Sequence, residues 1–275
     1  MTYGPGPAGR RRLLPRPRVV LAGALALAAV AVPAGAGAVV GGERAGGAYP
    51  FVAGVSLRGD GGAQTHRCGG SLVAARWVLT AAHCVLSGGE AIDAARLGVR
   101  VGSPDRTRGG AEAGVQRVVV HPDHSPATRH ADLALLRLDR ALGQEPVAPA
   151  TAPPVPGDAV RLVGWGYLSN RDRELPAELR RADTTVTADA DCLAGTEDDL
   201  TEGDFCHSPE PGTGSCNGDS GSPVLRYADG RWRQIGVISR DLNADPARVE
   251  CGALPGVSPS VPHHAGWIAD VIGVG

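Results

Sequence analysis

The segment Cys216-Asn217-Gly218-Asp219-Ser220-Gly221-Ser222-Pro223 decides how the rest of this chain is interpreted. Two earlier segments belong with it. They are Leu79-Thr80-Ala81-Ala82-His83-Cys84, preceded by Cys68-Gly69-Gly70-Ser71-Leu72, and Asp132-Leu133-Ala134-Leu135-Leu136. The three segments supply a serine, a histidine and an aspartate that could carry nucleophilic and acid–base chemistry. A lone serine, aspartate or histidine usually faces solvent or caps a turn. The three segments are informative because they occur together, in the order His83, Asp132, Ser220.

Together the three segments resemble the signatures of the chymotrypsin/trypsin family of serine endopeptidases. The resemblance runs from Val39 to the end of the chain, and Gly164-Trp165-Gly166 and Pro255-Gly256-Val257 are further matching segments. It implies an all-β protein of two six-stranded antiparallel β-barrels packed together, with a short C-terminal helix. The implied activity is hydrolysis of peptide bonds in protein or peptide substrates through an acyl-enzyme intermediate, without a cofactor.

The chemistry explains why these residue types are needed. A serine hydroxyl is a weak nucleophile at neutral pH, so a base has to take its proton during attack and return it to the leaving amine. Histidine can do both because its ordinary pKa is about 6.5. A buried carboxylate holds the ring in the productive tautomer and stabilises the imidazolium. We therefore expect Ser220 to be the nucleophile, His83 the base and Asp132 the orienting carboxylate.

The resemblance also implies roles for neighbouring residues. The backbone N–H groups of Gly218 and Ser220 would form the oxyanion hole. Ser239 would be the serine that lies beside the buried aspartate. No metal site is predicted: His121, His124 and His130 are expected in an exposed loop, and the remaining histidines (His66, His207, His263, His264) at the surface.

The first 38 residues have the layout of an export signal. An apolar run from Val19 to Val32 is followed by a possible A-x-A cleavage site, Ala36-Gly37-Ala38, and is preceded by Arg10, Arg11, Arg12, Arg16 and Arg18. An uncleaved membrane anchor is the alternative, but the run is shorter than the roughly 18 to 20 residues that a spanning helix needs. We expect residues 1–38 to be removed and the protein to be secreted, with no membrane association afterwards.

The segment Val39-Val40-Gly41-Gly42 resembles the mature N-terminus of the family. In the family the new α-ammonium pairs with the aspartate before the nucleophile, which is Asp219 here. Cleavage after Ala38 would create this terminus directly, whereas cleavage after Ala36 would leave a dipeptide for a second protease to remove. The alternative is that residues 39–42 are only a flexible junction.

Six cysteines in an exported chain favour three disulfides over thiol chemistry or zinc. Their number alone allows 15 connectivities. The resemblance implies the pairs Cys68–Cys84, Cys192–Cys206 and Cys216–Cys251.

Short apolar or alternating stretches separated by Gly-, Pro- and Asp-rich segments are typical of an all-β fold. We expect one protease domain over 39–275, with a first barrel at about 39–150 and a second at about 151–262. Apolar residues at helical spacing around Trp267 and Ile268 predict the final helix, at about 263–273.

The substrate pocket is where the resemblance is weakest. Gly214 stands at its expected base, where trypsin-like members carry an aspartate, next to Ser215, and Gly256 stands where the pocket width is set. These residues favour an uncharged aromatic or aliphatic side chain. Arg240-Asp241 replaces an aromatic residue and glycine of many relatives. Asp241 could attract a cationic side chain or narrow the entrance; alternatively, both side chains face solvent.

The formal net charge is −2, with both signs interspersed, which excludes the basic stripe of a nucleic-acid-binding protein. The abundance of Ala, Gly and Pro and the use of arginine for every basic side chain are typical of a GC-rich bacterial genome. We expect a bacterial monomer that protein inhibitors could bind. Two alternatives remain: a catalytically impaired, protease-like binding protein whose cleft Arg240 and Asp241 block, and an esterase that uses the same triad.

Overall fold

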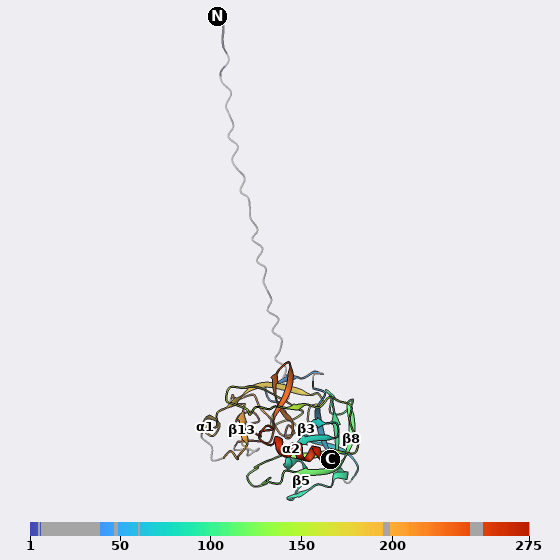
Figure 1. Cartoon of the computed structure of the whole chain (residues 1–275). Helices are drawn as coiled ribbons and strands as arrows, with labels where there is room; N and C mark the ends of the chain where they lie inside the picture. Colours follow the sequence, from blue (N-terminus) through green and yellow to red (C-terminus); the bar gives the residue numbers. More distant parts are fainter. Residues whose placement is uncertain are drawn as a thin grey trace. The chain divides into compact units, whose positions relative to one another are not determined.

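The computed structural model describes residues 1–4, 6, 39–46, 49–59, 61–194, 199–208, 210–242 and 250–274. Contacts divide the chain into Met1–Ala34 and Gly35–Gly275. Of the predicted export signal only residues 1–4 and 6 are described, so the expected cleavage site lies outside the described residues. The strands and helices below all belong to the second unit (Figure 1).

The first half of this unit forms a closed antiparallel barrel, as predicted. Its strands pair in the order β2-β3-β4-β9-β8-β7. They are β2 (Val52–Arg58), β3 (Gln64–Ala74), β4 (Trp77–Thr80), β7 (Leu97–Val101), β8 (Ala111–Val120) and β9 (Ala134–Leu138). Strand β9 is buried on both faces, because Leu135 and Leu136 point to opposite sides and neither is exposed.

The second half forms a nine-stranded sheet. Its main path runs β10-β15-β14-β11-β12-β13-β17-β16, and β1 (Glu43–Arg44) pairs with β12. The path consists of β10 (Ala148–Pro149), β15 (Arg231–Val237), β14 (Pro223–Ala228), β11 (Ala159–Gly164), β12 (Arg180–Thr187), β13 (Asp204–His207), β17 (Gly256–Pro259) and β16 (Arg240–Asp241). One pair, β10 with β15, is parallel. A single bridge joins Gly236 of β15 to Ser260 beyond β17. A second closed barrel stays a prediction.

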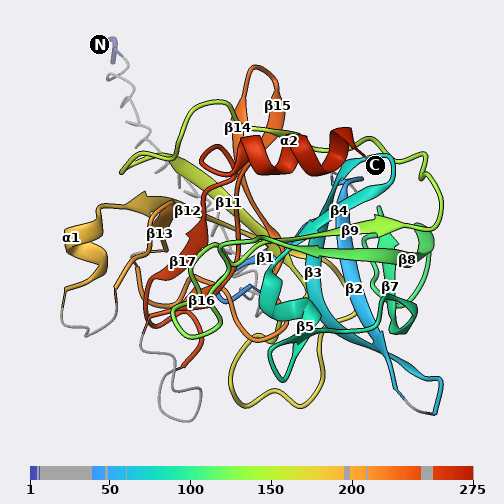
Figure 2. The same cartoon turned by 60° about the horizontal axis from the view of Figure 1, so that its bottom comes forward.

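Short elements complete the fold. The 3-10 helices η1 (Ala82–Val85) and η2 (Ala94–Arg96) flank the small hairpin of β5 (Leu86–Ser87) and β6 (Glu90–Ala91), and α1 is Asp189–Cys192. The helix α2 (Ala265–Gly273) begins two residues later than predicted. Ile268 is buried and packs with the first-barrel core, although the helix follows the second sheet in sequence (Figure 2). No helix among the described residues is long and apolar enough to cross a membrane.

Three disulfides fasten the loops to the sheets, and they are the pairs that the resemblance implies. Cys68–Cys84 joins β3 to η1, Cys192–Cys206 joins α1 to β13, and Cys216–Cys251 joins the segment before Ser220 to the segment before β17. Their Cα atoms lie 6.0, 6.2 and 5.1 Å apart, within the usual range for disulfides.

Candidate active site

Strand pairing brings His83 and Asp132 together. Thr80, the last residue of β4, lies opposite Ala134, the first residue of β9. His83 follows the one strand by three positions and Asp132 precedes the other by two, so both emerge at the same edge of the barrel. The Nδ1 atom of His83 lies 2.7 Å from Asp132 Oδ2, and the backbone N–H of His83 donates to Oδ1 at 2.9 Å.

The Asp132 carboxylate is fully buried. Burial alone would raise its pKa, but the hydrogen bonds and charge of His83, together with a hydrogen bond from Ser239, outweigh burial and lower the pKa to about 2. The Ser239 hydroxyl, in the segment between β15 and β16, donates to Oδ2 at 2.6 Å. Arg129 also approaches, with Nη1 3.8 Å from Oδ2. The carboxylate is therefore ionised at neutral pH and fixed from three directions.

The backbone of Ser220 lies against the segment that precedes His83. The N–H of Gly69 donates to the Ser220 carbonyl at 2.8 Å. Gly69 follows Cys68, whose disulfide partner Cys84 follows His83, and Cys84 Sγ lies 3.8 Å from His83 Nε2. Within the described residues, no hydrogen bond joins the Ser220 hydroxyl to His83.

Two backbone donors near Ser220 are left free. The N–H groups of Asp219, Gly221 and Ser222 all donate to carbonyls, whereas in the described part of the chain those of Gly218 and Ser220 donate to nothing. Gly218 has a φ of +98°, which a residue with a Cβ rarely adopts. Its carbonyl accepts a hydrogen bond from His66 Nε2 at 3.1 Å, so this peptide group is held in one orientation.

Asp219 is a buried carboxylate without a cationic partner among the described residues. It accepts hydrogen bonds from the N–H groups of Gly166 at 2.7 Å and Cys216 at 3.1 Å. Burial, opposed by these two bonds, raises the pKa of Asp219 to about 7. Such an environment favours either a proton on the carboxyl or a cation beside it.

The segment 39–42 is docked in the second half of the structure. Val39 is fully buried and belongs to the same apolar cluster as Leu162 and Ile235. Val40 exchanges two backbone hydrogen bonds with Gly214, at 2.9 and 3.2 Å. Residue 38 lies outside the described residues.

The expected pocket residues meet around an acidic group. Asp241 on the edge strand β16 lies opposite Gly256 on β17, and the Ser215 hydroxyl donates to Asp241 Oδ1 at 2.9 Å. Burial raises the pKa of Asp241 to about 6, although the Ser215 hydrogen bond opposes this shift. No ion pair reaches this carboxylate within the described residues. Gly256 packs on the ring of His207, which a Cβ would approach to 2.5 Å.

Arg240 points away from this carboxylate. Its Nη2 atom lies 2.8 Å from Asp204 Oδ2, and that carboxylate belongs to β13. Both side chains of the Arg240-Asp241 pair therefore have buried or partly buried partners, and the alternative in which both face solvent is wrong. Sequence reasoning missed Asp204 because it lies 36 residues before Arg240 and reaches it only across the intervening strand β17.

The prediction of surface positions is wrong for His207 and His264, and that of an exposed loop is wrong for His121 and for the His124 side chain, which is 3% exposed and lies 3.9 Å from Asp132 Oδ1. His207 is fully buried between the hydroxyls of Ser208 and Ser258, at 3.1 and 3.0 Å, and burial lowers its pKa to about 4. His121 and His264 are also buried, with their Nε2 and Nδ1 atoms 3.2 Å apart. Each of these three buried histidines has an apolar neighbour in sequence, Val120, Cys206 or Ala265, and these neighbours are the signal that could have marked the three as buried.

Among the described residues, one group of three metal-ligating side chains comes together: Cys68, His83 and Cys84. Its two sulfur atoms are joined in a disulfide. They are therefore not available as thiolate ligands.

A family model described as Trypsin matches residues 38–268. The chain is 32% identical over 253 residues to serine proteinase stubble of Drosophila melanogaster, which covers 84% of this chain and 31% of that protein. It is 28% identical over 249 residues to serine protease 28 of Mus musculus, covering 84% of this chain and 87% of the relative. It is 31% identical over 226 residues to protein masquerade of Drosophila melanogaster, and the match covers 75% of this chain and 21% of that protein. The chain thus spans under a third of both Drosophila relatives and most of the mouse protein. This chain belongs to the trypsin family.

Proposed function

We propose that this chain is a secreted serine endopeptidase that hydrolyses peptide bonds in proteins or peptides with His83, Asp132 and Ser220. The observation that supports this most is the buried Asp132 carboxylate, which accepts hydrogen bonds from the side chain and the backbone of His83. Because Nδ1 faces the carboxylate, the neutral ring carries its proton there. Its Nε2 atom is then free to accept a proton.

In this mechanism a rotation of the Ser220 side chain brings its hydroxyl to His83 Nε2. The Ser220 oxygen attacks the substrate carbonyl carbon while Nε2 takes the hydroxyl proton, and a tetrahedral oxyanion forms. Collapse of this intermediate breaks the C–N bond, and the imidazolium gives its proton to the leaving amine. Water then repeats the sequence on the acyl-enzyme, releasing the acid and restoring Ser220.

The free N–H groups of Gly218 and Ser220 support their role as the oxyanion hole. Donors that are not engaged elsewhere and are held by the surrounding backbone stabilise the developing negative charge without reorganisation. Losing one such donor in other enzymes costs about 100- to 1,000-fold in kcat.

We propose further that residues 1–38 are removed on export and that 39–275 form the protease domain. The buried, docked position of Val39 and the raised pKa of Asp219 both favour a free α-ammonium at Val39. Such a cation would pair with Asp219 and order the loop that carries Gly218. Signal peptidase acting after Ala38 would then produce the active form directly.

Asp241 is expected to set the preference for the residue before the scissile bond. Gly214 leaves the pocket base without charge, which alone favours an apolar side chain. The buried Asp241 carboxylate, bonded to Ser215 and lacking a cation within the described residues, favours an arginine or lysine instead. We therefore propose that the pocket prefers a substrate with a cationic side chain before the scissile bond. The acidic group would be Asp241 in the pocket wall, whereas trypsin-like relatives carry an aspartate at the pocket base, the position of Gly214.

A fluorophosphonate probe with mass spectrometry tests the proposal. Protein that starts at Val39 should be labelled at Ser220 and should cleave casein, while Ser220→Ala should do neither and keep the fold. Absence of labelling in the folded protein would favour the binding-protein alternative. Labelling with ester turnover but no peptide turnover would favour the esterase.

A further inference from the structure

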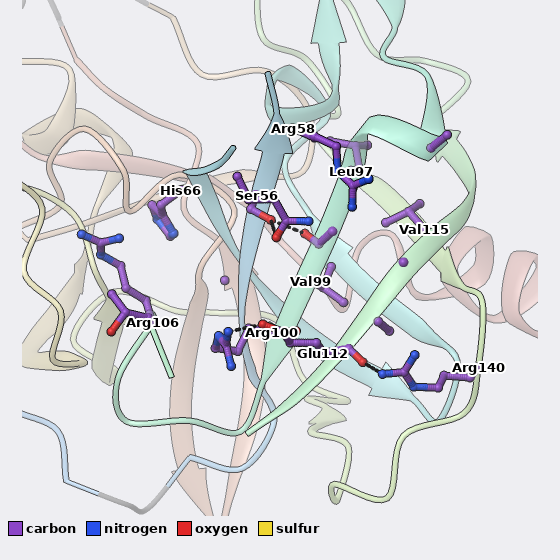
Figure 3. A pocket seen from close by; sticks show the side chains of 17 residues that line it. Ser56, Arg58, His66, Leu97, Val99, Arg100, Arg106, Glu112, Val115 and Arg140 are labelled. Carbon is purple, nitrogen blue, oxygen red and sulfur yellow. Dashed lines mark hydrogen bonds and ion pairs between the residues drawn. The ribbon is translucent and has the colours of Figure 1, made fainter. Parts of the chain in front are cut away.

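A cavity of about 530 Å³ lies on the first barrel and is lined from strands β2, β3, β7 and β8 and the loops that flank them (Figure 3). Four arginines line it: Arg58, Arg100, Arg106 and Arg140. Glu112 is the one acidic residue in the lining. The lining is therefore strongly cationic, although the whole chain has a formal net charge of −2.

Two of the four arginines are already engaged by acidic residues. Arg100 forms an ion pair with Glu112, and Arg140 donates to the backbone carbonyl of Glu112 and lies 3.8 Å from Asp139. The charges of these two arginines are therefore at least partly compensated by acidic neighbours.

The other two arginines, Arg58 and Arg106, have no carboxylate partner within the described residues. The guanidinium of Arg106 donates to the carbonyls of Pro176 and Leu175, both at 2.9 Å, and is therefore held in place while its charge stays uncompensated. Arg58 is exposed. A ligand with two or more carboxylates could pair with both cations without first breaking an ion pair.

One end of the cavity adjoins the proposed oxyanion hole. Figure 3 shows Arg106 and His66 at the same end, and His66 Nε2 donates to the carbonyl of Gly218. Leu175, whose carbonyl Arg106 binds, also packs on Gly218, since a Cβ there would lie 2.9 Å from Leu175 Cδ2. Asp241 and Ser215 belong to the second half of the structure, whereas this cavity belongs to the first. A polypeptide with one residue at Asp241 would reach the cavity with residues after the scissile bond.

We propose that this cavity is an accessory binding site for an acidic segment of the polypeptide substrate, located after the scissile bond and paired with Arg58 and Arg106. This inference rests on the proposed proteolytic function for its substrate, but the binding step itself needs no turnover. Exposed ion pairs are individually weak and are screened by salt. Two of them should give an advantage of about tenfold in KM at low ionic strength, and less in high salt.

Matched fluorogenic peptides test the proposal. All carry the same cleavage sequence, followed or preceded by either a Glu-rich segment or a Ser-Gly segment. The measured quantity is the ratio of kcat/KM between the Glu-rich and the Ser-Gly peptide, because a general effect on folding or chemistry cancels in it. We expect a ratio of about ten for the segment after the bond, falling toward one in 0.5 M NaCl.

The ratio should fall toward one in Arg58→Gln and Arg106→Gln, and should stay near ten in Arg231→Gln, which removes an exposed arginine on β15. A wild-type ratio near one, or an equal effect of all three substitutions, would overturn the proposal. So would an advantage confined to the segment before the bond.

A binding measurement separates this proposal from the proteolytic function. A labelled Glu-rich peptide without a cleavable bond is titrated into Ser220→Ala protein and followed by fluorescence anisotropy. Salt-sensitive binding that Arg58→Gln and Arg106→Gln weaken supports the site even if no peptide is cleaved. Binding of a sulfated polysaccharide, but not of the peptide, would show a different ligand class and refute the assignment.

Discussion

Keeping Ala38 in front of Val39 should convert the proposed α-ammonium into an uncharged amide and leave Asp219 without a cation. The magnitude follows from the carboxyl group, because burial raises the pKa of Asp219 from 3.8 to about 7. A difference of about three pKa units corresponds to roughly 4 kcal/mol between the ionised and the neutral form. An extension of one residue should therefore cost much of a typical domain's stability.

The sign of this effect depends on pH. The unfolded chain releases the Asp219 proton near pH 3.8 and the folded, extended chain near pH 7. Between these values the folded state binds more protons, so stability falls as pH rises and then levels off above pH 7. In a chain that starts at Val39 the ammonium would stabilise the carboxylate and remove this loss. The two chains should differ by about 4 kcal/mol near pH 7.5 and by little near pH 4.

Urea unfolding of the two chains, both carrying Ser220→Ala to prevent self-cleavage, measures this difference at pH 4.5, 6.0 and 7.5. Asp219→Asn is the matched control. It should recover stability in the chain that starts at Ala38 and reduce stability in the chain that starts at Val39. Without Ser220→Ala, the extended chain should also lose most of its peptidase activity. Equal stability at every pH, or equal activity, would refute the pairing of Val39 with Asp219.

Three further outcomes are expected. Ser239→Ala removes a hydrogen bond to the ionised Asp132, a class worth about 1.5–3 kcal/mol, so kcat should fall by about tenfold or more with the fold intact; an unchanged kcat argues against this positioning role. Asp241→Asn should lower the ratio of kcat/KM for peptides with arginine before the scissile bond to kcat/KM for those with leucine there. The expected decrease is at least about tenfold, roughly one lost charge-assisted contact. An unchanged ratio in a peptide library would rule out Asp241 as the determinant. Burial lowers the pKa of His207 from 6.5 in the unfolded chain to about 4 in the folded one. Between these values the unfolded chain binds more protons, so the free energy of unfolding should fall as pH drops from 6.5 toward 4. In urea titrations, His207→Gln should make the decrease in the free energy of unfolding between pH 6.5 and pH 4 smaller by about 3 kcal/mol. The same decrease as in the wild type would contradict this.

The pairing of His83 with Asp132 could be predicted because each residue lies within a short, distinctive segment, whereas the role of Ser220 stays a prediction. The spacing of glycine, serine and proline around Ser220 reflects local backbone demands, such as the positive φ of Gly218 and Gly221. The final helix was also predictable, since its apolar spacing is local. The first barrel followed from the same resemblance, and its closed ladder confirms that prediction.

Contacts between distant segments could not be predicted from the residues alone. Arg240 meets Asp204 and Ser215 meets Asp241 because strand register, rather than neighbouring sequence, decides which side chains face each other. The buried ring of His207 likewise has hydrogen-bond partners both next to it, in Ser208, and 51 residues away, in Ser258.

The sequence by itself therefore determined the family, the order of the expected catalytic residues and the all-β class. These properties depend on local requirements of backbone and side chain, which residues adjacent in the sequence satisfy among themselves. Only the tertiary structure decided which carboxylates are buried without a cation and which arginines gather on one face. Those properties depend on the sum of desolvation and charge over groups that the strands bring together from across the chain.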